Sequence, residues 1–168
     1  SDFIGGSFTG NFTGDGSGLT NIASSEVFRY CFTSNITAAC LTSHPNINSN
    51  ACNNFFVGVG AGCSIFGGCN NNFFGCNSGR NTTSGNNNNF FGLRSGCCNT
   101  TGGCNNFLGE DSGASNSSGS QNNFFGLCAG YCNTTGCLNN FIGRQAGFAN
   151  TTGGHNTFFG QNAGIHQE

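Results

Sequence analysis

Apolar and polar positions recur every 17 residues from residue 53 to the C-terminal end of the sequence, without an insertion or a deletion. Counted from Asn54, the third position of the repeat is always Phe, the fourth is apolar, and the fifth and ninth are always Gly. A strict short period predicts a solenoid, in which each repeat is one coil and neighbouring coils bury each other.

The length of the repeat restricts what one coil contains. Seventeen residues are too few for a helix, a strand and two turns, whereas two short strands and two tight corners fit. We therefore expect an all-β fold, a parallel β-solenoid (a β-helix or β-roll) of about seven 17-residue coils, preceded by an extended N-terminal strand segment. Stacked parallel strands ~4.8 Å apart would make the seven coils a rod roughly 30 Å long.

The two adjacent apolar positions predict a core and an assembly face, because successive residues of a strand point to opposite sides. The third position is expected to fill the interior as a core ladder of Phe56, Phe73, Phe90, Phe107, Phe124, Phe141 and Phe158. The fourth position would then form an exposed apolar column of Val57, Phe74, Phe91, Leu108, Phe125, Ile142 and Phe159. Monomers rarely expose a stripe of this size, so copies of the chain are expected to cover it. The alternative is a bulge or corner that turns both positions inward.

Two polar features follow the same period. The first position is Asn in all seven repeats, which predicts a ladder of side-chain amides bonded from coil to coil. Arg94 and Asp111 both occupy the seventh position, one repeat apart, and are expected to stack as an ion pair.

Composition argues against several classes of function. Charged residues are 6% of the 168 residues, against roughly 25% in ordinary globular proteins. The net charge of −2 and the four dispersed Arg residues leave no basic patch for nucleic acid. The sequence contains no apolar run near the ~20 residues that span a bilayer, so membrane insertion is not expected.

Catalysis and cofactor binding are not expected either. His44, His155 and His166 have no Ser or Cys partner in a recognisable motif, and the acidic residues are few and scattered. The GDGSG run at 14–18 is better interpreted as a turn than as a calcium or phosphate loop, because no ring of carboxylates or following helix accompanies it.

Twelve cysteines indicate an oxidising, extracellular setting and a disulfide framework. A metal site is disfavoured because no C-x2-C knuckle or Cys/His cluster occurs. Four pairs bracket short loops and are the disulfide candidates: Cys63 with Cys69, Cys98 with Cys104, Cys132 with Cys137, and Cys31 with Cys40. The other four, Cys52, Cys76, Cys97 and Cys128, bridge either coils or subunits, and spacing does not decide between these pairings.

The sequence also contains seven N-x-S/T sequons, which are candidates for covalent N-glycans. Their asparagines are Asn11, Asn35, Asn81, Asn99, Asn116, Asn133 and Asn150. The last four share one repeat position, where sugars ~4.8 Å apart would crowd one another. A turn-forming role is expected for most of that column, with sugars on some sites only.

Composition divides the chain into three parts. Residues 1–25 are a Gly- and Phe-rich connector, expected to dock on a neighbouring subunit; residues 26–52 are a Cys-containing strand and loop insert; residues 53–168 are the solenoid. The stretch SFTGNFTGDGSGLTNI at 7–22 resembles segments of phage and bacterial tail-fibre-like proteins, and the NNFFGxxAGxxNTTG coil is similar to repeats that follow such segments. A looser similarity links the coil to the head repeats of trimeric autotransporter adhesins. The resemblance implies an extracellular, commonly trimeric, fibrous protein.

These features predict a structural subunit of an extracellular, self-assembling fibril whose copies stack head to tail. The alternative is a carbohydrate- or host-binding fibre shaft. A more remote alternative is an ice-binding solenoid, suggested by the recurring Thr pairs at 100–101, 134–135 and 151–152.

Overall fold

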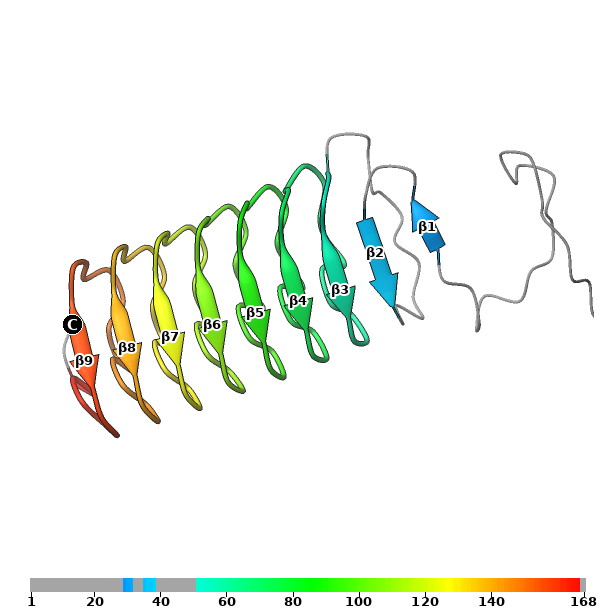
Figure 1. The fold of residues 1–168 in the computed structure, drawn as a ribbon. Coiled ribbons are helices and arrows are strands. Elements are labelled where there is room, and N and C mark those ends of the chain that lie inside the picture. Colours follow the sequence, from blue (N-terminus) through cyan, green and yellow to red (C-terminus); the bar gives the residue numbers. More distant parts are fainter. Residues whose placement is uncertain (1–28, 32–34, 39–50, 167–168) are drawn as a thin grey trace, which may run out of the picture.

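The computed structural model describes residues 29–31, 35–38 and 51–166, and the solenoid occupies the last of these ranges. Each coil contributes one three-residue strand, and the seven strands lie side by side in a parallel sheet (Figure 1). They are β3 (Phe55–Val57), β4 (Asn72–Phe74), β5 (Asn89–Phe91), β6 (Asn106–Leu108), β7 (Asn123–Phe125), β8 (Asn140–Ile142) and β9 (Thr157–Phe159). Each residue pairs with the one 17 positions later, as Phe73 does with Phe90. The predicted all-β parallel solenoid is confirmed.

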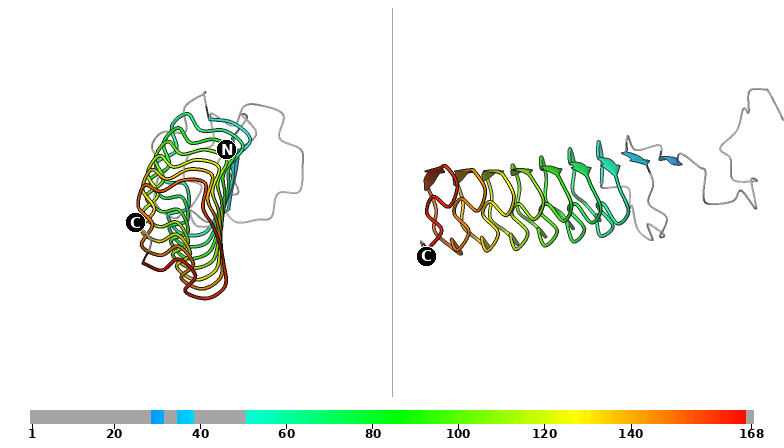
Figure 2. Two further views of the ribbon diagram at one scale, coloured as in Figure 1. Left: turned by 90° about the vertical axis from the view of Figure 1, so that its left-hand side faces the viewer. Right: turned by 90° about the horizontal axis from the view of Figure 1, so that it is seen from below.

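The coils superimpose along one axis, so that the described chain forms a rod (Figure 2). The prediction of two strands per coil is wrong, because the side opposite the sheet consists of turns. Residues in the left-handed region also limit each strand at its two ends: Leu138, before β8, has φ 62°, and Arg94, after β5, has φ 53°. The turns still bond from coil to coil, with the Gly62 amide donating to the Ser78 carbonyl at 3.0 Å.

The third-position Phe side chains form the core. The six from Phe56 to Phe141 are at most 1% exposed, and successive rings stack with centroids 4.8–4.9 Å apart. Complete burial of one such side chain stabilises a fold by about 1.5–3 kcal/mol. The fourth-position side chains point to the other face, as in β4, where Phe73 is buried and Phe74 is partly exposed. A bulge that turns both positions inward is therefore excluded.

The sheet extends further toward the N-terminus than the repeat does. Strand β2 (Asn35–Ala38) pairs in parallel with β3, and β1 (Arg29–Cys31) pairs antiparallel with β2. Two segments of the predicted 26–52 insert thus continue the solenoid sheet instead of standing apart from it. The predicted 1–25 connector lies outside the described residues.

The fifth-position glycine allows neighbouring coils to approach closely. Gly92 has φ +141°, and a Cβ added there would clash with the backbone carbonyl of Gly109 in the next coil. Neither the backbone at Gly92 nor that at Gly109 can move away without disturbing the pairing of the adjacent strands. A side chain at this position would therefore force neighbouring coils apart.

Substituting Gly92→Ala tests this constraint. We expect a loss of unfolding free energy of roughly 2–4 kcal/mol, from strained backbone and overpacking together. The control is Gly67→Ala, because a Cβ at Gly67 would meet open space. Chemical denaturation followed by circular dichroism measures both, and equal stability of the two variants would contradict the close-approach role.

Candidate assembly surface

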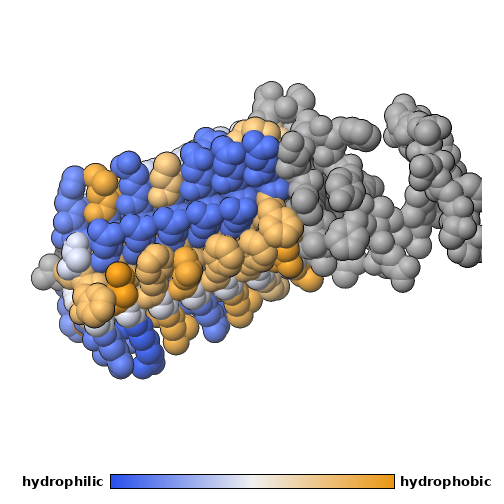
Figure 3. Space-filling model, in the orientation of Figure 1, coloured by the Kyte–Doolittle hydropathy of each residue, from blue (hydrophilic) through white to orange (hydrophobic). Residues whose placement is uncertain are grey.

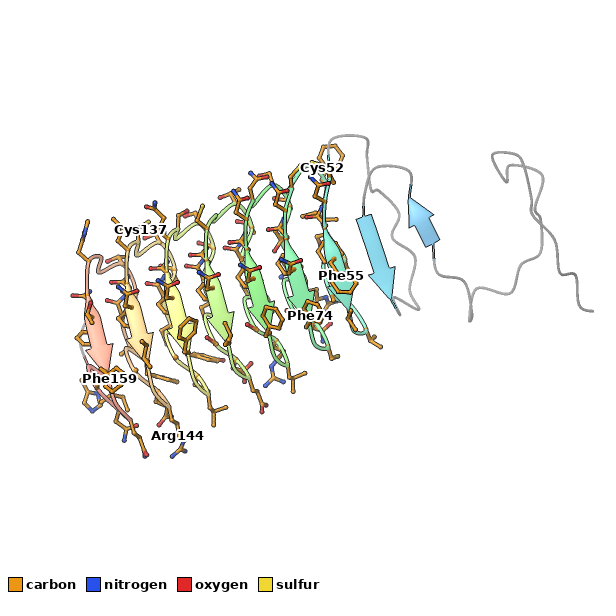
Figure 4. All side chains as sticks on the ribbon, viewed as in Figure 1. Cys52, Phe55, Phe74, Cys137, Arg144 and Phe159 are labelled. Carbon is orange, nitrogen blue, oxygen red and sulfur yellow. The ribbon has the colours of Figure 1, made fainter. Side chains whose placement is uncertain are left out.

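The outward apolar column is the largest exposed feature of the sheet. Phe91, Leu108 and Phe159 are 40%, 42% and 80% exposed. The Phe74 and Phe91 rings stack at 4.7 Å, and Phe55 meets Phe74 edge-on at 5.0 Å. Phe55 and Phe74 lie together on the outer face of the strands, and Phe159 lies at the far end of the same row (Figure 4).

The apolar surface is wider than the sequence analysis predicted. The sixth repeat position adds Val59, Leu93 and Leu127, which are 50%, 38% and 40% exposed. The space-filling view shows the combined band along the side of the rod (Figure 3). We call the fourth- and sixth-position apolar residues together the apolar stripe. The sixth position escaped notice because it also holds Glu110 and Arg144, so it carries no uniform apolar signal.

A ladder of amides runs beside the stripe on the same face of the sheet. In the second repeat position, the Nδ2 of each asparagine donates to the Oδ1 of the next at 2.7–2.8 Å. Its members are Asn72, Asn89, Asn106, Asn123 and Asn140. The hydrogen bonds of these amides are satisfied from coil to coil along the rod. This face of the sheet therefore carries a polar amide column beside the apolar stripe.

The predicted ladder in the first position is present but bonds differently from expectation. The Oδ1 of Asn71 accepts from the backbone amide of Asn88 at 3.0 Å, and its Nδ2 donates to the Gly85 carbonyl at 2.8 Å. This pair of backbone contacts recurs in other coils, whereas side-chain amides bond directly at only some steps, such as Asn71 to Asn54 at 3.0 Å. The first-position asparagines therefore tie side chain to backbone across coils more than they tie amide to amide.

A third asparagine column lies buried in the corner opposite the sheet. Asn116 Nδ2 donates to Asn99 Oδ1 at 2.8 Å, and Asn133 and Asn150 continue the chain at the same distance. All four residues are at most 1% exposed. These are the asparagines of four sequons, and their amide nitrogens are already donors inside the solenoid. The expectation that some of these four carry sugars conflicts with their burial, which leaves a glycan no room.

The remaining sequons differ in accessibility. Asn81 lies one position earlier in its coil than the buried column and is exposed. Asn35 lies in β2, but its side chain is outside the description, and Asn11 is outside the described residues altogether.

The charged residues form the predicted ion pair. Arg94 donates through Nε and Nη2 to the two carboxylate oxygens of Asp111, each at 2.6 Å, and Glu110 lies 3.7 Å away. The hydrogen bond to Asp111, and then its charge, raise the pKa of Arg94. A pair exposed to this degree contributes little to stability.

The sulfur contacts differ from the predicted corner pairs. The Cys98 Sγ lies 3.7 Å from that of Cys97, whose pKa is raised to about 12 by burial first and by Cys98 second. The Cys137 sulfur accepts from the Ser120 amide and donates to the Thr135 carbonyl, each at 3.3 Å. Bridges from Cys98 to Cys104 and from Cys132 to Cys137 stay predictions. Cys31 lies in β1, and its predicted partner Cys40 lies outside the described residues.

The recurring threonines use their hydroxyls within the rod. The Oγ1 atoms of Thr83, Thr100 and Thr134 donate to carbonyls of the next coil at 2.9–3.1 Å. They lie in turns and not on a strand, so they do not form a flat hydroxyl array of the kind the ice-binding alternative requires.

Other kinds of site were sought in the described ranges. No group of three or more His, Cys, Asp or Glu residues in them is placed to hold a metal ion. No helix within residues 29–31, 35–38 and 51–166 has the length and apolarity to cross a membrane. Comparisons with protein-family models, curated proteins and solved structures found no match to this chain.

One buried hydroxyl offers a test of the corner column. Thr82 precedes the asparagines of that column by one coil, and its Oγ1 is buried without a hydrogen-bond partner. We expect Thr82→Val to raise the unfolding free energy by about 1–3 kcal/mol, because the cost of the unsatisfied group disappears. The matched control is Thr83→Val, which removes a hydroxyl bonded to Thr100 at 3.1 Å and should destabilise. Thermal unfolding of both variants distinguishes the loss of an unsatisfied hydroxyl from the loss of a hydrogen bond. A Thr82→Val variant less stable than the parent would show that the buried Thr82 hydroxyl does not destabilise the fold.

Burial also predicts where sugar attaches within the solenoid. On secretion from a eukaryotic host, Asn81 should be the only solenoid sequon to carry an N-glycan, because its acceptor side chain is exposed. Glycopeptide mass spectrometry with enzymatic deglycosylation in oxygen-18-labelled water would locate the modified residues, and Asn81→Gln is the control. Occupancy at Asn116 or Asn133 in folded protein would contradict the buried ladder.

Proposed function

We propose that the protein is a structural subunit of an extracellular, self-assembling fibre whose copies stack head to tail and associate side by side. The observation that carries the proposal is the repetition of one self-complementary surface. Every coil offers the next a strand edge, a flat Phe ring and a row of amides in the same register.

The last described coil supports axial stacking. Phe158 stacks on Phe141 at 5.0 Å, yet it is only half-buried, whereas the preceding ring is fully buried. Strand β9 carries the same outward edge that β8 offers to β9. Among the described strands β9 pairs with β8 alone, and a strand edge of this kind readily pairs with another chain. A second copy seated there would extend both the sheet and the Phe column, and residues 1–25 are proposed to dock on the neighbour.

The apolar stripe supports side-by-side association. It runs the length of the coils, roughly 30 Å at ~4.8 Å per coil, and extended exposed apolar surface of this kind marks sites of protein association. The small number of charges, 6% of the sequence, creates little repulsion between adjacent rods. The twelve cysteines favour an extracellular location, and the exposed sequon at Asn81 is compatible with it.

A carbohydrate-binding shaft is the second candidate. Tyr131 and Phe148 stack at 5.2 Å in the tenth repeat position, and both are partly exposed. The exposed edges of these stacked rings form an aromatic patch that a sugar ring would contact through its apolar face. Binding on a glycan array that is lost in Tyr131→Ala would favour this candidate over the fibre subunit.

The fibre proposal predicts an assembly that depends on the stripe. Purified protein should form rods longer than one solenoid by electron microscopy, and Phe74→Ser with Phe91→Ser should abolish lateral bundles while leaving the circular dichroism spectrum unchanged. Phe66→Ser is the matched control, since Phe66 is 56% exposed but lies outside the stripe.

The result that overturns the proposal is equally definite. Discrete particles in micrographs, together with a monomer in analytical ultracentrifugation, would contradict both axial and lateral assembly. Bundles that persist in the double variant would contradict the role of the stripe alone.

A further inference from the structure

Cysteines that share a repeat position mostly lie two or more coils apart, and one pair differs. Cys52 and Cys69 both stand in the sixteenth position, in successive coils. Among the described cysteines, no other two share a position in adjacent coils. Because residues at the same position stack along the rod, these two side chains leave the same corner one above the other.

The hydrogen bonds around the two cysteines fix their register. The Asn70 amide donates to the Cys52 carbonyl at 2.9 Å, and Asn53 Nδ2 donates to Asn70 Oδ1 at 3.2 Å. Paired parallel segments lie ~4.8 Å apart, inside the Cα separation of about 4.4–6.8 Å that a disulfide spans. Figure 4 places Cys52 at the corner of the first coil, on the row that Cys137 continues further along the rod.

The two thiols also interact. Cys52 and Cys69 share a side-chain hydrogen bond, which is the first cause of the raised pKa of Cys52, ahead of burial. Cys69 also lies within 3.9 Å of the Gly67 carbonyl, two residues earlier. Both cysteines are partly exposed, so a small oxidant reaches them without opening the solenoid.

We propose that Cys52 and Cys69 form a disulfide that staples the first coil to the segment preceding it. The oxidant is a small-molecule disulfide such as oxidised glutathione. Two S–H bonds are lost and one S–S bond forms, while the oxidant takes up the two electrons and two protons and is cleaved to two thiols. This pairing replaces the Cys63–Cys69 bridge predicted from spacing, because it joins coils instead of closing a corner.

The staple lies where the regular coils begin, and there it is expected to limit local opening of the solenoid. In a solenoid each coil contacts only its neighbours, so local opening begins where a coil has least support. Before β3 the regular 17-residue spacing is lost, since β2 pairs with β3 at a 19-residue offset, as Ile36 does with Phe55. The bond therefore holds the register at the point where the repeat begins.

Peptide mapping tests the pairing on the intact chain. Protein equilibrated with oxidised glutathione is alkylated with N-ethylmaleimide and digested with chymotrypsin without reduction. Cleavage after Leu41, Phe55, Phe56, Phe66 and Phe73 places Cys52 in 42–55, Cys63 in 57–66 and Cys69 in 67–73. The expected product is 42–55 linked to 67–73, which reduction separates. Linkage of 67–73 to 57–66, any other partner for either cysteine, or alkylation of both thiols overturns the proposal.

Hydrogen exchange tests the consequence. Reduction should speed amide exchange at residues 53–57 by roughly 100-fold, the factor expected on opening a loop of this length, and should leave residues 140–159 unchanged. Cys52→Ser should exchange at the reduced rate with or without oxidant, whereas Cys63→Ser should behave like the parent. If Cys52→Ser does not fold, the parent map still decides the pairing. Equal exchange in the oxidised and reduced parent contradicts the staple's protective role.

Discussion

Axial stacking at a fixed 17-residue spacing is the constraint on which the rest of this structure depends. Because each side chain lies directly against its own counterpart, every position must tolerate contact with a similar residue. Aromatic rings and primary amides meet that requirement: rings stack face to face, and an amide is both donor and acceptor. Charges do not, and the one acidic residue of the seventh position, Asp111, faces an arginine in the preceding coil. The scarcity of charge thus has a structural cause.

The same constraint governs the backbone. Glycines and left-handed residues turn the chain at the corners of the coils, and non-glycine residues such as Leu138 adopt that conformation at a cost in free energy. The pairing of each inner strand with two neighbours offsets this cost. Stability is therefore shared along the rod instead of residing in one compact core, as is general for solenoids.

Buried asparagines fix the conformation of the corner opposite the sheet through their hydrogen bonds. A polar group in the interior is tolerated when its hydrogen bonds are satisfied, and the Asn99 to Asn150 column satisfies them with its own members and with glycine carbonyls such as that of Gly119. The NTT and NSS triplets are consequently part of the fold. Their match to the glycosylation sequon reflects the turn they build, and Asn81 alone among the solenoid sequons presents its amide to the outside.

The sequence by itself determined whatever depends on period alone. Register places Phe73 on Phe90 and Arg94 on Asp111, and strand alternation sends Phe73 inward and Phe74 outward, so these contacts followed from counting residues. Only the tertiary structure decided what depends on the course of the turns: the single strand per coil, the burial of Asn116, and the exposure of Asn81. Backbone angles at the corners set those outcomes, and a corner residue has no alternation to reveal whether its side chain faces the interior or the solvent.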